Sequence, residues 1–150
     1  MNWKLIIVGG LVFFIATWIV GFATGFLIHE VVLDEAYRAT EDFWQPALRE
    51  DPPDLAALMP RWIGIGLLSA FVTAAIYGWI RSSFNGPGWK KGLQYGLMLW
   101  LLIGFLYLGL SGVFYLPNEI WLWWIVDALV LYCLGGAALG WFAERWAPAG

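Results

Sequence analysis

The chain has very little of what catalytic and metal sites are built from. It contains one cysteine, Cys133, and one histidine, His29. A single cysteine excludes an intrachain disulfide, a CxxC redox centre and a cysteine-based zinc site. A single histidine excludes bis-histidine haem within one chain. The serines have no GxSxG context, and neither a P-loop nor a GxGxxG fingerprint occurs. Nothing in the sequence points to an enzyme, and we expect no cofactor.

Charge is also scarce. Only 13% of the residues are charged, 61% are hydrophobic, and the formal net charge is -3. The basic residues are too few and too scattered for a nucleic-acid surface, so we expect no nucleic acid partner. What the chain has instead is long apolar segments. The first runs without a charge over residues 5–28, longer than the core of a cleavable signal peptide, and no A-x-A-like site follows. We expect it to be a retained helix.

These segments predict an all-α fold, an integral membrane bundle of four transmembrane helices forming a single membrane domain over 1–150. The expected spans are residues 3–28, 62–81, 92–114 and 119–142. Between the first two, over 30–61, apolar residues recur at i, i+3, i+4 and i+7 opposite acidic ones, which predicts an amphipathic extracytoplasmic helical segment. We expect this helix to be disturbed near Gln45-Pro46, and to cover the end of the bundle or to form a surface for a partner. Asp54 is expected to cap a short turn over 55–59.

Small residues at helical spacing predict where the helices touch. In lipid the hydrophobic effect does not drive helix association, and small residues let the backbones approach closely. GxxxG pairs and small-xxx-small ridges give the expected packing residues, Gly21, Gly25, Ala70, Ala74, Gly78, Gly92, Gly96, Gly136 and Gly140.

The basic residues predict orientation. They gather at one set of helix ends, at Lys4, Arg81, Lys90, Lys91 and Arg145. By the positive-inside rule both termini and the loop over 82–91 are cytoplasmic, and the acidic connection lies outside. We expect a multi-pass protein of a bacterial inner membrane.

Three features together resemble a known kind of protein. They are Ile28-His29 followed by Leu33 and Tyr37, the region Tyr77…Gly86-Pro87-Gly88…Gly92…Gly96, and a closing helix rich in small residues. This pattern resembles that of small four-helix bacterial membrane proteins of uncharacterised function. The resemblance spans most of the chain and implies the fold, but no activity and no site residues.

Asp127 is the one carboxylate inside the last apolar segment, and an ionisable residue there is a site hypothesis by default. It lies roughly 10–12 Å below the outer end. Thr24, Ser69 and Tyr107 count to the same depth, which predicts a buried polar layer. No Lys or Arg lies at that depth, and burial away from a cation disfavours the charged form. A neutral aspartate that ties helices together, a proton or cation site, and a contact to a partner or lipid all remain open.

His29 sits at the outer end of the first span beside Glu30, Asp34 and Glu35. These residues could gather a divalent ion, and His29-Glu30 resembles half of an HExxH zinc motif. Position 33 is a leucine, however, and catalytic zinc usually has three protein ligands. We therefore expect a water-facing histidine at the interface and no metal.

Two functional classes fit these observations. The first is a non-catalytic accessory or structural subunit of a larger membrane complex. The second is a small oligomeric channel or carrier for protons or cations that uses Asp127. A membrane enzyme and a pigment- or lipid-binding protein are further possibilities. The expected partners are the lipid bilayer and either another membrane protein or further copies of the chain.

Overall fold

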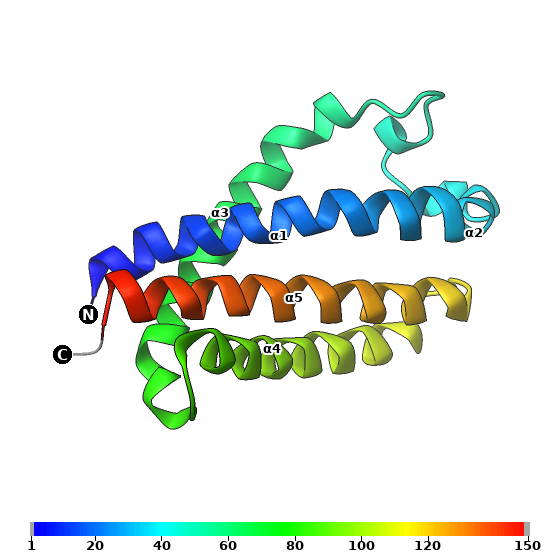
Figure 1. Ribbon diagram of the computed structural model, residues 1–150. Helices are drawn as coiled ribbons and strands as arrows, with labels where there is room; N and C mark the ends of the chain where they lie inside the picture. The colour runs from blue at the N-terminus through cyan, green and yellow to red at the C-terminus, as the bar shows by residue number, and fades with distance from the viewer. Residues whose placement is uncertain (1, 149–150) are drawn as a thin grey trace.

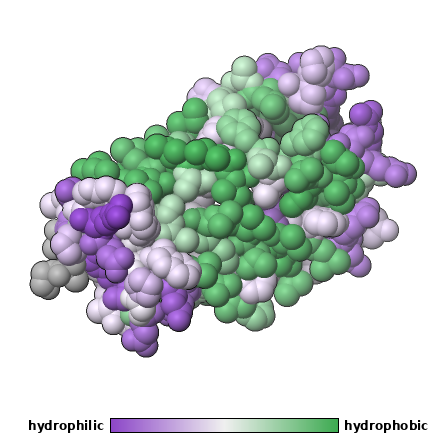
Figure 2. All heavy atoms as spheres, in the orientation of Figure 1, coloured by the Kyte–Doolittle hydropathy of each residue, from purple (hydrophilic) through white to green (hydrophobic). Residues whose placement is uncertain are grey.

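A computed structural model describes residues 2–148, and within that range the chain is all-α with no strand. Its helical stretches include four that are long and apolar enough to cross a membrane: Leu5–Val32, Leu55–Ser83, Gly88–Ser111 and Asn118–Trp146. The chain is therefore a multi-pass membrane protein. Figure 2 shows hydrophobic residues across the middle of one face and hydrophilic residues gathered at its two ends.

The first stretch contains wide π-helical turns at both ends of an α-helix. It consists of η1 (Leu5–Gly9), α1 (Gly10–Thr24) and η2 (Gly25–Val32). In η2 each backbone hydrogen bond joins an N–H to the C=O five residues earlier. The segment ends where Leu33 N–H donates to Ile28 O at 2.9 Å. This span extends four residues beyond the predicted 3–28, so His29 lies inside it rather than after it.

The closest packing joins α4 (Gly88–Ser111) to α5 (Asn118–Trp146), which lie side by side in Figure 1. Gly92 and Gly96 face Gly136 and Gly140 so closely that a Cβ on any of the four would collide with backbone atoms of the facing helix. The other glycine pair differs. A Cβ on Gly21 would meet only Leu131, and one on Gly25 would meet nothing within 4 Å. Gly25 therefore packs against no neighbouring helix within this chain.

The helix α3 (Leu55–Ile80) packs mainly through residues 70–80, which lie toward the two ends of the chain (Figure 1) and which we call its inner half. Outside this half, Gly66 lies against Phe14 of α1. Ala70, Ala74 and Tyr77 are buried in one cluster with Leu5 and Leu139, and Gly78 lies against Leu5. Two hydrogen bonds fix this half. The Tyr95 hydroxyl donates to Thr73 O at 2.9 Å, and Arg81, in the 3₁₀ turn η5 (Arg81–Ser83), donates to Ala147 O at 2.6 Å.

The outer half of α3 leans away from α1 and α5 (Figure 1), and residues 60–65 are all exposed. The helix begins at Leu55 rather than at the predicted residue 62. Asp54 caps it by accepting from Ala57 N–H at 3.2 Å, but the expected short turn continues into the span. Pro60 lies inside this helix, where it removes one backbone hydrogen bond.

The connection over 33–54 is a series of short turns: α2 (Asp34–Arg38), η3 (Glu41–Phe43) and η4 (Pro46–Leu48). The long amphipathic helix predicted there does not form. Its path breaks at Thr40, whose hydroxyl donates back to Ala36 O at 2.8 Å, and at Pro46. Its apolar side still covers the outer end of the bundle, because Leu33 and Ala36 are buried against Ile28 and Ile120. We call residues 33–54 the outer cap.

The contact between α4 and α5 yields a test with a matched control. Gly136→Ala places a methyl group against the backbone of α4, and we expect it to lower the free energy of unfolding by about 1–3 kcal/mol. Gly25→Ala adds the same group in open space and should have little effect. Unfolding in mixed micelles by a denaturing detergent measures both. Equal stabilities would contradict the close contact.

Candidate functional site

Four side chains from three elements form one connected group at the outer end of the bundle. His29 comes from η2, Tyr37 from α2, and Trp124 and Asp127 from α5. The Trp124 indole nitrogen lies 2.7 Å from the Tyr37 hydroxyl, which lies 2.6 Å from His29 Nδ1. On the other side of the imidazole, His29 Nε2 lies 3.6 Å from Asp127 Oδ2. We call these four residues the His29–Asp127 group.

The chemistry of the donors sets the direction of these hydrogen bonds. An indole N–H can only donate, so the Tyr37 oxygen accepts from Trp124. The Tyr37 O–H is then available to donate to Nδ1 of His29. Donation to Nδ1 leaves the imidazole proton on Nε2, the nitrogen that faces Asp127, whereas the opposite tautomer would turn a bare Nε2 toward the carboxylate. The group thus presents an N–H donor to the carboxylate without needing a cation.

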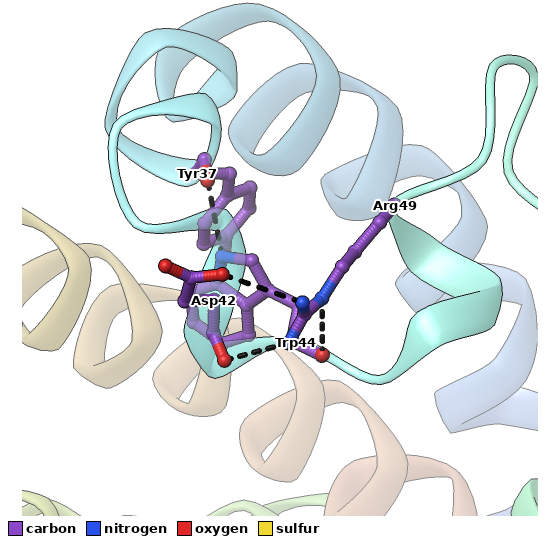
Figure 3. Close-up of polar contacts among 4 residues, drawn as sticks. All are labelled: Tyr37, Asp42, Trp44 and Arg49. Atoms are coloured by element: carbon purple, nitrogen blue, oxygen red, sulfur yellow. Dashed lines mark hydrogen bonds and ion pairs between the residues drawn. The ribbon is translucent and has the colours of Figure 1, made fainter.

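Tyr37 is held in place by the outer cap. Its ring stacks on His29 with centroids 5.8 Å apart and planes 9° from parallel. Trp44 donates from its indole N–H to Tyr37 O at 3.1 Å. Trp44 is fixed in turn by Arg49, which donates to Trp44 O at 2.9 Å and to Asp42 O at 2.6 Å (Figure 3). The position of the hydroxyl therefore depends on the fold of the whole cap.

Burial keeps the Tyr37 hydroxyl protonated. Loss of solvent raises the pKa of Tyr37 from 10.0 to about 12, and this outweighs the hydrogen bond from Trp124, which lowers it. The neighbouring Asp127 carboxyl raises it slightly further. At any physiological pH the side chain is a neutral phenol, as its role as a donor to His29 requires.

A pocket of about 240 Å³ opens beside the carboxylate. It is lined by His29, Tyr107, Trp124, Asp127, Ala128, Leu131 and Tyr132. Two buried polar atoms nearby have no hydrogen-bond partner among residues 2–148: Asp127 Oδ1 and the indole nitrogen of Trp121. An unpaired buried polar group costs about 1–3 kcal/mol. A bound molecule that donates a hydrogen bond to this acceptor would therefore gain the most binding free energy here.

The structure brings together only part of the predicted polar layer. Tyr107 lines the same pocket as Asp127. Ser69 is exposed on the leaning half of α3, and the Thr24 hydroxyl donates to Val20 O of its own helix at 3.2 Å. Within the described chain, neither of these two is bonded to Asp127. Ser69 and Thr24 would lie at the depth of Asp127 only if the helices were parallel, whereas α3 leans and the first span ends in wide turns.

The predicted outer-face group is divided. The side chain of His29 is only 32% exposed and points to Asp127 rather than to water. Asp34 instead pairs with Arg38 at 3.0 Å, and Glu30 and Glu35 are exposed. Over residues 2–148 no three His, Cys, Asp or Glu side chains come together in a way that could hold a metal ion.

Sequence reasoning missed Tyr37 and Trp124 as members of the site. For Trp124 a signal existed, because it precedes Asp127 by three residues and so shares its helix face. For Tyr37 there was none, since its position depends on how the outer cap folds back.

No protein-family model matches this chain, and no match is found among curated proteins or solved structures.

Removing the Tyr37 hydroxyl should loosen the outer cap. Tyr37→Phe leaves the Trp124 N–H and His29 Nδ1 without their partner, and we expect a loss of about 1–3 kcal/mol. Proteolysis of the cap in detergent measures this directly. Tyr115→Phe is the control, because Tyr115 is 96% exposed. Cleavage as slow in Tyr37→Phe as in the control would show that the hydroxyl does not hold the cap.

The same residue predicts a response to alkaline pH. The folded pKa of about 12 exceeds the ordinary 10.0, so the stabilisation is complete below pH 10 and is lost as the pH rises toward 12. The ultraviolet titration of the wild type, minus that of Tyr37→Phe, should show one tyrosine ionising near pH 12. A difference centred on pH 10 would mean that Tyr37 is exposed to solvent.

Asp127→Asn should fold and insert into the membrane. Asparagine keeps the size of the side chain and an oxygen acceptor beside His29 Nε2, which lies 3.6 Å from the carboxylate, and hydrogen bonds between membrane helices average only ~0.6 kcal/mol. The amount of protein in the membrane fraction, compared with wild type, measures this. Failure to accumulate would mean that the group requires a charged aspartate.

Proposed function

We propose that this chain is a non-catalytic integral membrane protein that serves as a subunit of a larger membrane complex. The observation that carries the proposal is the outer half of α3, which leaves the bundle and packs on little of its own chain (Figure 1). In a water-soluble protein, folding would bury an apolar surface of this kind. In a membrane the surface faces lipid or another protein.

The composition of that surface supports a protein contact. Large apolar side chains point outward from it: Trp62, Ile63, Ile65 and Leu68 are 39–67% exposed. Among them lies Gly64, whose missing side chain would meet nothing within 4 Å. A glycine in a row of large apolar residues gives a facing helix a place to approach closely.

The use of the polar groups supports the same proposal. In the His29–Asp127 group, Tyr37 joins the outer cap to α5 through Trp124 and to η2 through His29. These contacts hold elements together, as expected of a structural part. The proposal includes the orientation that the basic residues favour, with both termini in the cytoplasm of a bacterial cell and the outer cap on the other side of its inner membrane.

The test is gentle solubilisation from native membrane followed by native mass spectrometry. We expect the chain in a larger complex at fixed stoichiometry. Gly64→Leu should reduce the fraction in the complex several-fold, because the added side chain fills the place of closest approach. Gly109→Leu is the matched control, since a Cβ at Gly109 also meets nothing within 4 Å but lies on α4. Recovery of the wild-type chain alone, or only with copies of itself, would contradict the proposal.

A second candidate function is a small oligomeric carrier or channel for protons or cations. One observation favours it: Asp127 Oδ1 has no donor among residues 2–148, beside the pocket. Towards the inner side an apolar cluster that includes Phe13, Leu139 and Phe142 follows the pocket, which supports a carrier rather than an open pore. Proton flux into liposomes, abolished by Asp127→Asn, would favour this function over the first.

A further inference from the structure

We propose that the pocket beside His29 and Asp127 binds the hydroxyl group of an uncharged, membrane-dissolved amphiphile, an alcohol- or phenol-headed lipid that enters sideways from the bilayer. This goes beyond the subunit function and does not depend on it.

The pocket is the part of the bundle that α3 leaves uncovered. Ala128, in its lining, and Leu139 are eleven residues apart on α5, about three turns, and so lie on the same face. Leu139 is buried in one cluster with Ala70 and Ala74 of the inner half of α3. The outer half of α3 leans away from α5 (Figure 1), and α3 contributes no residue to the lining of the pocket at Ala128. The pocket is thus left open on the side from which α3 has leaned away, and we call this side the open groove.

The open side of the pocket faces the bilayer. Above it the outer cap covers Trp124, which contacts Trp44 with ring centroids 6.2 Å apart and donates its indole N–H to the Tyr37 hydroxyl. His29 and Asp127 nevertheless remain 32% and 16% exposed. Asp127 lies nine residues into α5, roughly 13 Å from its start. At this depth the surroundings are lipid, so a ligand reaches the pair laterally.

His29 and Asp127, the pair of polar side chains in the pocket, favour a hydroxyl group as their ligand. The 3.6 Å between His29 Nε2 and Asp127 Oδ2 is too long for a direct hydrogen bond. One hydroxyl oxygen between them can accept from the Nε2–H and donate its own proton to the carboxylate. A group that only donates, such as an ammonium, would face the imidazole N–H. An anion would face the carboxylate, and no Lys or Arg of the described residues lines the pocket to offset it.

The size and lining of the pocket fit the head of such a molecule. A volume of about 240 Å³ is below the ~300–1,000 Å³ of pockets that enclose a whole drug-sized ligand. It holds a small head, while the hydrocarbon chain extends into the open groove. Tyr107, Trp124 and Tyr132 supply aromatic walls and Leu131 an aliphatic one, so the atoms next to the hydroxyl are in apolar contact.

The test uses purified protein in phosphatidylcholine nanodiscs, with diacylglycerol and its methyl ether as matched probes. The two differ only in whether the head oxygen carries a proton. We expect native mass spectrometry to find at least tenfold more diacylglycerol than ether bound to the wild type, and only diacylglycerol to raise the melting temperature. Equal retention of the two would overturn the proposal, and so would stronger retention of phosphatidylethanolamine, which would assign the pocket to an ammonium.

Substitutions inside and outside the pocket test where the diacylglycerol binds. Ala128→Phe fills the pocket and leaves both members of the pair in place, so it should abolish the preference for diacylglycerol. Ala23→Phe adds the same ring to an exposed position of α1 and should retain it. Asp127→Leu, which removes the acceptor, is a second test in case the buried Ala128 does not tolerate the larger ring. A preference that persists in folded Ala128→Phe or Asp127→Leu would place the binding elsewhere.

Discussion

The outer half of this protein depends on one constraint: a polar group at bilayer depth must find its partner within the protein. No water is available there to replace a missing hydrogen bond. His29 and Asp127 both lie in spanning segments. Tyr37 is the hydrogen-bond partner of one nitrogen of the imidazole. The other nitrogen lies 3.6 Å from the carboxylate, too far for a direct hydrogen bond, which leaves the remaining hydrogen-bonding capacity of both side chains to the pocket. The outer cap is folded so as to deliver a single phenol to this place. Three features hold the cap in this position: its short turns, the burial of Leu33, and the hydrogen bond from Arg49 to Trp44 O.

The inner half is organised differently, by backbone contact. Glycines allow α4 and α5 to touch almost without side chains between them, and α3 adds a small apolar cluster against α1 and α5. Such packing needs few polar groups beyond the hydrogen bonds of Tyr95 and Arg81, and it fills the centre of the bundle with apolar side chains. The chain thus combines a dry, tightly packed inner half with an outer half held by a few directed hydrogen bonds. The two halves differ in the part that α3 plays. The inner half of α3 packs into the first, and its outer half leans away from the second.

The sequence was sufficient for the spans and the all-α class, because hydropathy and length reflect a single strong constraint. It also identified Asp127, since a carboxylate within an apolar segment is conspicuous. It could not place His29 against Asp127. That contact depends on wide turns in η2 that lengthen the first span, and on Tyr37 reaching back from a cap whose helix breaks already at Thr40, ahead of the disturbance expected near Pro46. Ser69 shows the same limit, because counting residues gives depth only for helices that stand parallel.

The π-helical segment η2 has a consequence for how this region can vary. Each residue of a helix turns the next by about 100°, so the wide turns between Gly25 and Val32 set the direction in which the His29 imidazole points. The side chains of Phe26 and Leu27 are 63% and 60% exposed and can be exchanged for other apolar groups without disturbing that direction. Loss or gain of one residue cannot be absorbed in this way, since it would rotate His29 away from both of its partners. In this stretch the number of residues matters more than their identity.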